Sequence, residues 1–188
     1  MGGNEATTNK GKGNLVPPAE IARLWRQHSS GLLLLVRARF GSRVDCEAED
    51  ILQDAFTRLA RQSQMPEDVL AWLVRTSRNL AIDALRSSKR RKEREGAVAS
   101  GRLDWFEETH SSAAFDLEAE AAIAELPADE REILVAHLWN GMSFRQIASA
   151  FETSSSAANR RYQSALEHLR SRLDPGGLQQ RQATAQRS

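Results

Sequence analysis

The stretch "SFRQIASAFETSSSAANRRYQSALEHLR", residues 143–170, has the pattern of two helices joined by a short turn. Ser143 followed three residues later by Gln146 is a capping-box pattern, which predicts that a helix begins there. The residues "ETS" at 152–154 predict a tight turn, and Ser154 or Ser155 is expected to cap the next helix. Apolar residues expected to face inward recur at helical spacing: Phe144, Ile147, Ala148 and Phe151, then Ala158, Tyr162, Ala165, Leu166, Leu169 and Leu173.

The outer side of the second predicted helix carries small and polar residues beside two arginines. Small side chains fill a core poorly, but they let a helix approach a bulky partner closely. A short helix, a turn and a second helix form the helix-turn-helix arrangement, whose second helix enters the major groove of DNA. We therefore expect duplex DNA to contact Ser155, Ser156, Asn159, Arg160, Arg161 and Gln163. An ordinary helical hairpin is the alternative.

The preceding segment, "LPADEREILVAHLWNG" at 126–141, predicts a helix with clear ends. Pro127 suits a first turn, and Asn140-Gly141 is a stop signal. The side expected to be buried consists of Ile133, Leu134, His137 and Leu138. On that side, His137 is interpreted as a histidine of the core or its boundary rather than as a ligand.

In the first half of the chain, "EAEDILQDAFTRLARQ" at 47–62 predicts a helix with one apolar and one acidic side. The apolar side consists of Ile51, Leu52, Ala55, Phe56 and Leu59, and the acidic side of Glu47, Asp50 and Asp54. Such an acidic side has three interpretations: a solvated surface, a metal site, or a docking face for a basic or polar partner. Carboxylates without histidine are weak evidence for a metal.

The next segment, "PEDVLAWLVRTSRNLAIDALRSSKRRKER" at 66–94, predicts a long helix with a basic side. Its apolar stripe is expected to be Val69, Leu73, Leu80 and Ala84, with Trp72 at the edge. On the opposite side, Arg75, Asn79, Ile82 and Arg86 lead directly into Lys89, Arg90, Arg91 and Lys92. Basic residues along one helix suit a phosphate backbone, and an asparagine among them can hydrogen-bond a base edge. A solvated helix with a basic end explains the charges but not the asparagine.

The charge distribution and the cysteine content further restrict the possible partners and sites. The net charge of the 188 residues is only +1, but residues 86–94 hold six basic residues and one acid, while residues 102–132 hold ten acids and two arginines. This asymmetry suggests one basic face for a polyanion. Cys46 is the single cysteine, so no internal disulfide forms, and no metal-ligand spacing surrounds it. We expect no metal and no cofactor.

The start of the chain lacks the apolar core of a signal peptide, and "LLLLV" at 32–36 is too short to cross a bilayer. The expectation is a cytoplasmic protein without membrane insertion. No period-2 strand pattern is present, so the predicted fold is all-α: two small helical domains joined by a flexible linker, the C-terminal one with the helix-turn-helix. The expected boundaries are a disordered segment 1–17, a domain 18–94, a linker 95–115, a domain 116–173 and a disordered tail 174–188.

The two halves together resemble a known family. "AEDILQDAFTRL" followed by "AWLVRTSRNLAIDALRSSKRR" resembles the second conserved region of bacterial RNA polymerase sigma factors. "AIAELPADEREILVAHLWNGMSFRQIASAF" with "RRYQSALEHLRSRL" resembles their fourth region. The chain is thus similar to a compact, two-domain sigma factor of the extracytoplasmic-function group of the sigma-70 family.

The resemblance implies a role for each surface. Glu47, Asp50, Gln53 and Asp54 match the helix that docks on the polymerase. Arg75, Arg78, Asn79, Arg86, Lys89, Arg90 and Arg91 match the region that reads the minus-ten promoter element as melted single strand. The loop at 62–68 matches the place where a flipped base is held, and the second domain would read the minus-thirty-five element as duplex. The implied partners are core RNA polymerase, promoter DNA, and an anti-sigma factor or other regulator.

The chain departs from the family at two places. Glu152 stands where the family usually has Gly in the turn, and Ala157, Ala158 and Asn159 stand where a threonine-valine-lysine run is common. A non-Gly residue at positive φ costs roughly 1–2 kcal/mol, which favours another shape for this turn.

Three functions follow from these patterns. The first is a promoter-recognition subunit with no catalysis of its own. The second is a stand-alone helix-turn-helix regulator whose first domain serves for dimerisation or sensing. The third is a metal-dependent nucleic-acid enzyme that uses Glu47, Asp50 and Asp54.

Overall fold

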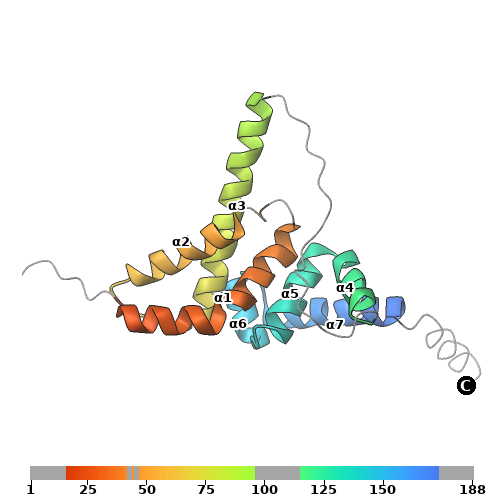
Figure 1. Ribbon diagram of the computed structural model, residues 1–188. Helices are drawn as coiled ribbons and strands as arrows, with labels where there is room; N and C mark the ends of the chain where they lie inside the picture. Colours follow the sequence, from red (N-terminus) through yellow and green to blue (C-terminus); the bar gives the residue numbers. More distant parts are fainter. Residues whose placement is uncertain (1–15, 42–43, 45–46, 96–114, 174–188) are drawn as a thin grey trace, which may run out of the picture.

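The computed structural model describes residues 16–41, 44, 47–95 and 115–173, and within them the secondary structure is helical throughout (Figure 1). The helices form two lobes, which confirms the predicted all-α fold with two helical domains. The first lobe comprises α1 (Pro18–Phe40), α2 (Ala48–Ala60) and α3 (Val69–Glu95). The second comprises α4 (Phe115–Glu125), α5 (Ala128–Leu138), α6 (Phe144–Ala150) and α7 (Ser155–Leu173). None of the described helices is long and apolar enough to cross a membrane.

The first lobe is a three-helix unit in which each helix packs on the other two. α1 begins at Pro18 and ends at Phe40, and the C-cap residue Gly41 that follows has a φ of 57°, which does not continue the helix. α2 turns its apolar side inward, and the ring of Phe56 meets Trp25 of α1 edge to face at 4.9 Å. The largest fully buried side chains of this lobe are Leu32, Leu35, Val36, Val44, Leu59, Leu73 and Val74.

The buried stripe of α3 differs in part from the predicted one. Leu73 is fully buried as expected, but Val69, Leu80 and Ala84 are only partly buried. Ala71, Val74, Ser77 and Ala81 complete the buried stripe instead. The small side chains among them let α3 lie close to its neighbours, and Figure 1 shows the second half of α3 projecting beyond the rest of the molecule.

In the second lobe, α5 is the central helix, because α1, α6 and α7 all pack against it. Every residue from Arg131 to Ala136 is buried, so α5 is covered on nearly all sides rather than on the one side predicted. The predicted burial of Leu138 is wrong: this residue is 52% exposed at the end of the helix, next to Trp139 at 46%. His137 bridges core and surface as expected, with Nδ1 2.8 Å from the Met142 carbonyl and its ring stacked on Phe144.

The helix-turn-helix has the predicted helix starts. Ser143 and Gln146 form a complete capping box, and Ser154 caps α7 by accepting a hydrogen bond from the Ala157 N–H at 3.1 Å. The expectation of another turn shape is wrong, because Glu152 adopts a φ of 54°. α6 ends in a Schellman arrangement, in which the Thr153 N–H donates to the Ala148 carbonyl at 3.0 Å. This ending requires left-handed backbone at Glu152 whatever side chain is present.

The two lobes pack directly on each other (Figure 1). α5 lies along α1, α6 lies along the first half of α3, and buried residues of both lobes belong to one apolar cluster. α3 extends to Glu95 and α4 begins at Phe115. The predicted tail, almost all of the predicted linker and the predicted N-terminal segment up to residue 15 therefore lie outside the described residues, and so does Cys46. Val16, at the end of that N-terminal segment, is buried, and Pro17 is the N-cap residue of α1.

Candidate nucleic-acid and polymerase interfaces

The acidic side of α2 is exposed along the helix. Asp50, Gln53 and Asp54 all face solvent, opposite the buried side, and Glu47 lies half-buried at the N-cap position without capping α2 through its side chain. Asp54 forms an ion pair with Arg58 one turn later at 3.2 Å, with both side chains about half exposed. This face therefore offers carboxylates to a partner at little desolvation cost.

The described part of the fold does not support a metal site on the acidic side of α2. Among the described residues, no group of three or more His, Cys, Asp and Glu side chains is placed to hold a metal ion.

The predicted minus-ten residues of α3 fall into two groups. Asn79, Arg86, Lys89 and Arg90 are exposed, and Arg86 lies 3.7 Å from Asp83 of the same helix. The side chain of Arg91 lies outside the described residues. Arg75 and Arg78, by contrast, contact the second lobe: Arg75 is ion-paired with Glu152, and Arg78 donates to Glu132 at 3.2 Å.

The loop at 62–68 also faces the second lobe. Glu67, Asp68 and Val69 form one wall of a groove of about 510 Å³, and Arg145, Gln146 and Ser149 of α6 form the other. Asp68 fixes the loop at the start of α3 by accepting a hydrogen bond from the Ala71 N–H at 3.0 Å. The structure thus places the loop expected to hold a flipped base beside the first helix of the helix-turn-helix.

The expected duplex-reading side of α7 is open to solvent. Ser155, Ser156, Asn159, Arg160, Arg161 and Gln163 are all exposed. Arg161 turns back toward α5, where its guanidinium lies 3.6 Å from Asp129, so it supports the position of α7. Ala158 is fully buried and Ala157 partly, which seats the start of the helix close to the lobe while leaving the polar side chains outward.

Glu132 is the residue that sequence reasoning missed. Its side chain is only 4% exposed, and it lies 3.2 Å from Arg78 of α3 and 3.5 Å from Arg39 of α1. Burial raises the pKa of Glu132 to about 7, against the opposing attraction of the two arginines. The sequence does contain a signal for this burial, because Arg131 and Glu132 stand directly beside the apolar run "ILVA". Charged side chains are buried mostly when they have partners, so this position predicts oppositely charged partners from other helices.

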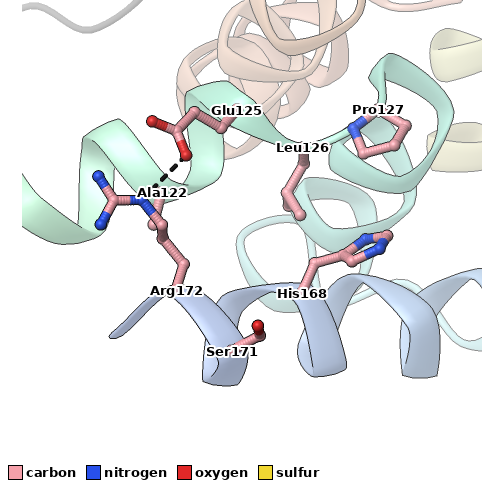
Figure 2. A pocket seen from close by; sticks show the side chains of 7 residues that line it. All are labelled: Ala122, Glu125, Leu126, Pro127, His168, Ser171 and Arg172. Carbon is pink, nitrogen blue, oxygen red and sulfur yellow. Dashed lines mark hydrogen bonds and ion pairs between the residues drawn. The ribbon is translucent and has the colours of Figure 1, made fainter. Parts of the chain in front are cut away.

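The far end of α7 is tied into its own lobe. A pocket of about 340 Å³ lies between the α4–α5 junction and α7. Figure 2 shows the side chains that line it: Ala122, Glu125, Leu126, Pro127, His168, Ser171 and Arg172. Arg172 donates to Glu125 at 3.0 Å across it, and His168 lies 2.7 Å from Glu130. These contacts stay within the second lobe and fix the direction of α7.

Two family descriptions match the chain. "Sigma-70 region 2" matches residues 24–91, and "Sigma-70, region 4" matches residues 116–169. The two matches correspond to the two lobes.

Curated proteins that are similar in sequence to this chain are named as RNA polymerase sigma factors. The chain is 34% identical over 136 residues to a probable RNA polymerase sigma factor, RfaY, of Xanthomonas campestris pv. campestris, covering 67% of this chain and 34% of that protein. It is 29% identical over 150 residues to the probable ECF RNA polymerase sigma factor SigI of Mycobacterium tuberculosis, covering 72% of this chain and 49% of that protein. The chain thus spans between a third and a half of the length of these relatives.

Solved structures share the fold. The sigma factor RpoE of Bartonella quintana, in complex with the anti-sigma factor NepR, superposes with a TM-score of 0.65 at 20% identity, covering 82% of this chain and 96% of that one. CnrH, in complex with the cytosolic domain of CnrY, gives 0.54 at 19% identity, covering 85% and 91%. With both conserved regions present on one all-helical fold, the chain belongs to the sigma-70 family of RNA polymerase sigma factors, in its extracytoplasmic-function group.

Proposed function

We propose that this chain binds core RNA polymerase in the cytoplasm and directs it to specific promoters, without catalysing a reaction itself. The observation that carries the proposal is that two exposed polar surfaces of different character lie on one chain. The exposed acidic side of α2 is suited to a protein partner, while the exposed start of α7 is suited to duplex DNA.

Three sets of residues would divide the work. Core polymerase would dock on Glu47, Asp50, Gln53 and Asp54. The melted minus-ten strand would contact Arg75, Arg78, Asn79, Arg86, Lys89, Arg90 and Arg91, and the minus-thirty-five duplex would contact Ser155, Ser156, Asn159, Arg160 and Gln163. Arg161 would join the last set by contacting a DNA phosphate. That phosphate would replace Asp129 as the partner of the Arg161 guanidinium. We assign polymerase docking and minus-ten recognition to a domain of residues 18–94, and minus-thirty-five recognition to a domain of residues 116–173.

An anti-sigma factor or other regulator is the remaining proposed partner. Support comes from the two solved structures of similar fold, one of which holds an anti-sigma factor and the other the cytosolic domain of a second protein.

Run-off transcription tests the proposal. Purified core polymerase is supplied with the chain and with a template that carries the region upstream of the protein's own gene. A discrete transcript that requires the chain is the expected result. No chain-dependent transcript, together with no binding to core polymerase, would contradict the proposal.

A stand-alone helix-turn-helix regulator predicts a different result. It would bind a palindromic duplex tightly in the absence of polymerase, whereas the proposed sigma factor binds free duplex weakly. A gel-shift titration of the chain on the same upstream region, with and without core polymerase, separates the two functions.

A further inference from the structure

The side of α7 that packs into the second lobe is formed largely by small side chains. Ala158 and Ala165 are the fully buried residues of α7, whereas the larger Tyr162, Leu166 and Leu169 are only partly buried. Packed helices fix their relative position when large side chains of one fit between those of the other. Two methyl groups allow a close approach but resist sliding and rotation of the helix only weakly. Other contacts are therefore needed to fix the rotation of α7 about its axis.

Glu130 supplies such contacts from the first turn of α5. Its Oε1 accepts a hydrogen bond from the Ser164 hydroxyl at 2.9 Å, and its Oε2 lies 2.7 Å from Nδ1 of His168. Because Ser164 and His168 are four residues apart, one carboxylate holds two successive turns on the same side of α7. Hydrogen bonds are directional, so these two contacts oppose the rotation that the alanines permit.

The Glu130 carboxylate faces α7 rather than solvent. Its side chain is only 12% exposed, although the His168 side chain is 54% exposed, so the contact with Ser164 is the better shielded of the two. The neighbouring Asp129 differs, because its side chain is 52% exposed and lies 3.6 Å from Arg161. An ion pair as exposed as this one contributes little to stability. Glu130 is thus the firmer of the two acidic contacts between α5 and α7.

The contacts of Glu130 lie away from the side chains expected to read duplex DNA. At 3.6 residues per turn, Asn159 and Gln163 lie on a different side of α7 from Ser164 and His168, and both are exposed. A rotation of α7 would change which polar side chains face the groove of a bound duplex without removing any of them. Hydrogen bonds to base edges weaken steeply when their angles are wrong, so such a rotation would alter sequence preference.

We propose that Glu130 is a positioning residue for duplex recognition. By holding Ser164 and His168, it sets the rotation of α7 and thereby the base sequence that the start of this helix prefers. The inference rests on the proposed function, since it assigns α7 to promoter duplex. Glu130 does not contact DNA in this arrangement and acts only through the orientation of α7.

The ratio of specific to non-specific duplex binding tests the proposal. Holoenzyme is titrated on a fluorescent duplex from the region upstream of the protein's own gene and on a shuffled duplex of the same composition, with the strands kept paired. Glu130→Ala should bind the upstream duplex about tenfold more weakly, while its binding to the shuffled duplex stays within about twofold. A folding defect would weaken both complexes equally, and the loss of a negative charge near DNA would strengthen both. An unchanged ratio would therefore overturn the proposal.

Conservative replacements separate the length of the side chain from its charge. Glu130→Gln keeps the length and can still accept from Ser164, so it should retain the ratio within about threefold. Glu130→Asp keeps the charge but is one methylene shorter, so it should lower the ratio at least about fivefold. Asp129→Ala removes the same charge from the same turn but only an exposed contact, and it should stay within about twofold. If Glu130→Asp stays closer to the wild type than Glu130→Gln, the carboxylate acts through charge and the positioning role is wrong.

A change made on α7 tests the same contact from the other side and does not depend on the folding of Glu130→Ala. Ser164→Ala removes one hydroxyl and should lower the ratio about threefold. Glu130→Gln combined with Ser164→Ala should bind no worse than Ser164→Ala alone, because the two residues form one contact. Full additivity of the two changes would contradict the proposal.

Hydrogen exchange tests how firmly α7 is held without polymerase or promoter. In the free full-length chain, the amides of residues 159–166 should exchange about three- to tenfold faster in Glu130→Ala and at an unchanged rate in Asp129→Ala. Unchanged exchange in Glu130→Ala would exclude the positioning role. Exchange that responds as expected, with a wild type that neither gives a chain-dependent transcript nor prefers the upstream duplex, would count against the proposed function alone. A wild-type preference that survives in Glu130→Ala would count against the positioning role alone.

Discussion

Glu132 shows how one buried carboxylate depends on elements from the whole molecule. It belongs to α5, but its charge is met by Arg78 of α3 and Arg39 of α1, while Asp129 of its own helix opposes it. Desolvation is the largest influence on its pKa, which rises from 4.5 to about 7. A carboxylic acid in this range titrates near neutral pH, so the stability of the protein should depend on pH there.

The sign of this dependence follows from the raised pKa. Between pH of about 4.5 and about 7, the folded protein keeps a proton on Glu132 that the unfolded chain has released. The free energy of unfolding attributable to Glu132 should therefore fall as pH rises through this window, by a few kcal/mol at most. Urea unfolding of the wild type and of Glu132→Gln between about pH 5 and about pH 8 measures it.

The comparison with Glu132→Gln removes the contribution of the other carboxyls. The wild type should lose stability relative to the variant as pH rises. Parallel curves, or a wild type that gains on the variant at higher pH, would contradict the raised pKa.

At the scale of the element, the two sides of α2 have different roles: one packs in the core and the other faces solvent. Its buried residues fix the helix in the first lobe, while Asp50 and Asp54 point away from the core. Changing the exposed side should therefore alter binding without removing the helix. The cost to the fold is limited to a less favourable first turn at Asp50 and the loss of one exposed ion pair at Asp54, together about 1 kcal/mol.

We expect the double variant Asp50→Lys with Asp54→Lys to bind core polymerase at least about tenfold more weakly, because it puts cations on a face suited to a complementary partner. A pull-down with core polymerase measures the binding, and circular dichroism confirms that the helices remain. Glu167→Lys on the exposed side of α7 is the control for a single charge reversal elsewhere on the surface, to be compared with each single variant of α2. A folded double variant that binds core polymerase as well as the wild type would exclude this face.

At the scale of the whole molecule, the two lobes should read two forms of DNA. Asn79 lies exposed on α3, where single-stranded DNA is expected, and Arg160 lies exposed near the start of α7, where duplex is expected. A helix that enters a major groove contributes before the strands separate, whereas contacts to unpaired bases contribute afterwards. The two positions should therefore affect different steps of initiation.

In the holoenzyme, Asn79→Ala should impair promoter opening while leaving the affinity of the closed complex nearly intact. Arg160→Ala should weaken duplex binding, by about 1–3 kcal/mol if it makes a bidentate base contact, or reduce the salt dependence if it contacts phosphate. Transcription from a pre-melted template should rescue Asn79→Ala but not Arg160→Ala. An equal response of both variants would show that the lobes do not divide the work in this way.

The local features of this protein could be predicted from its sequence, because short-range interactions produce them. The capping box at Ser143 and Gln146, the cap at Ser154 and the acidic side of α2 depend on residues only a few positions apart. Periodicity was sufficient for the all-helical fold for the same reason. The resemblance to the family then supplied expected roles for the exposed faces, which local patterns left open.

Only the tertiary structure decided which of these faces are covered. Leu138 belongs to the predicted apolar side but is exposed, whereas the charged Glu132 is buried, because the packing of α1 on α5 determines which sides are covered. The pairing of Arg75 with Glu152 joins residues 77 positions apart, and no local pattern specifies such a contact. The sequence by itself determined where the two helices of the helix-turn-helix begin and which side chains the predicted helices offer. Long-range packing determined that two basic residues expected to bind DNA are held by the protein's own carboxylates.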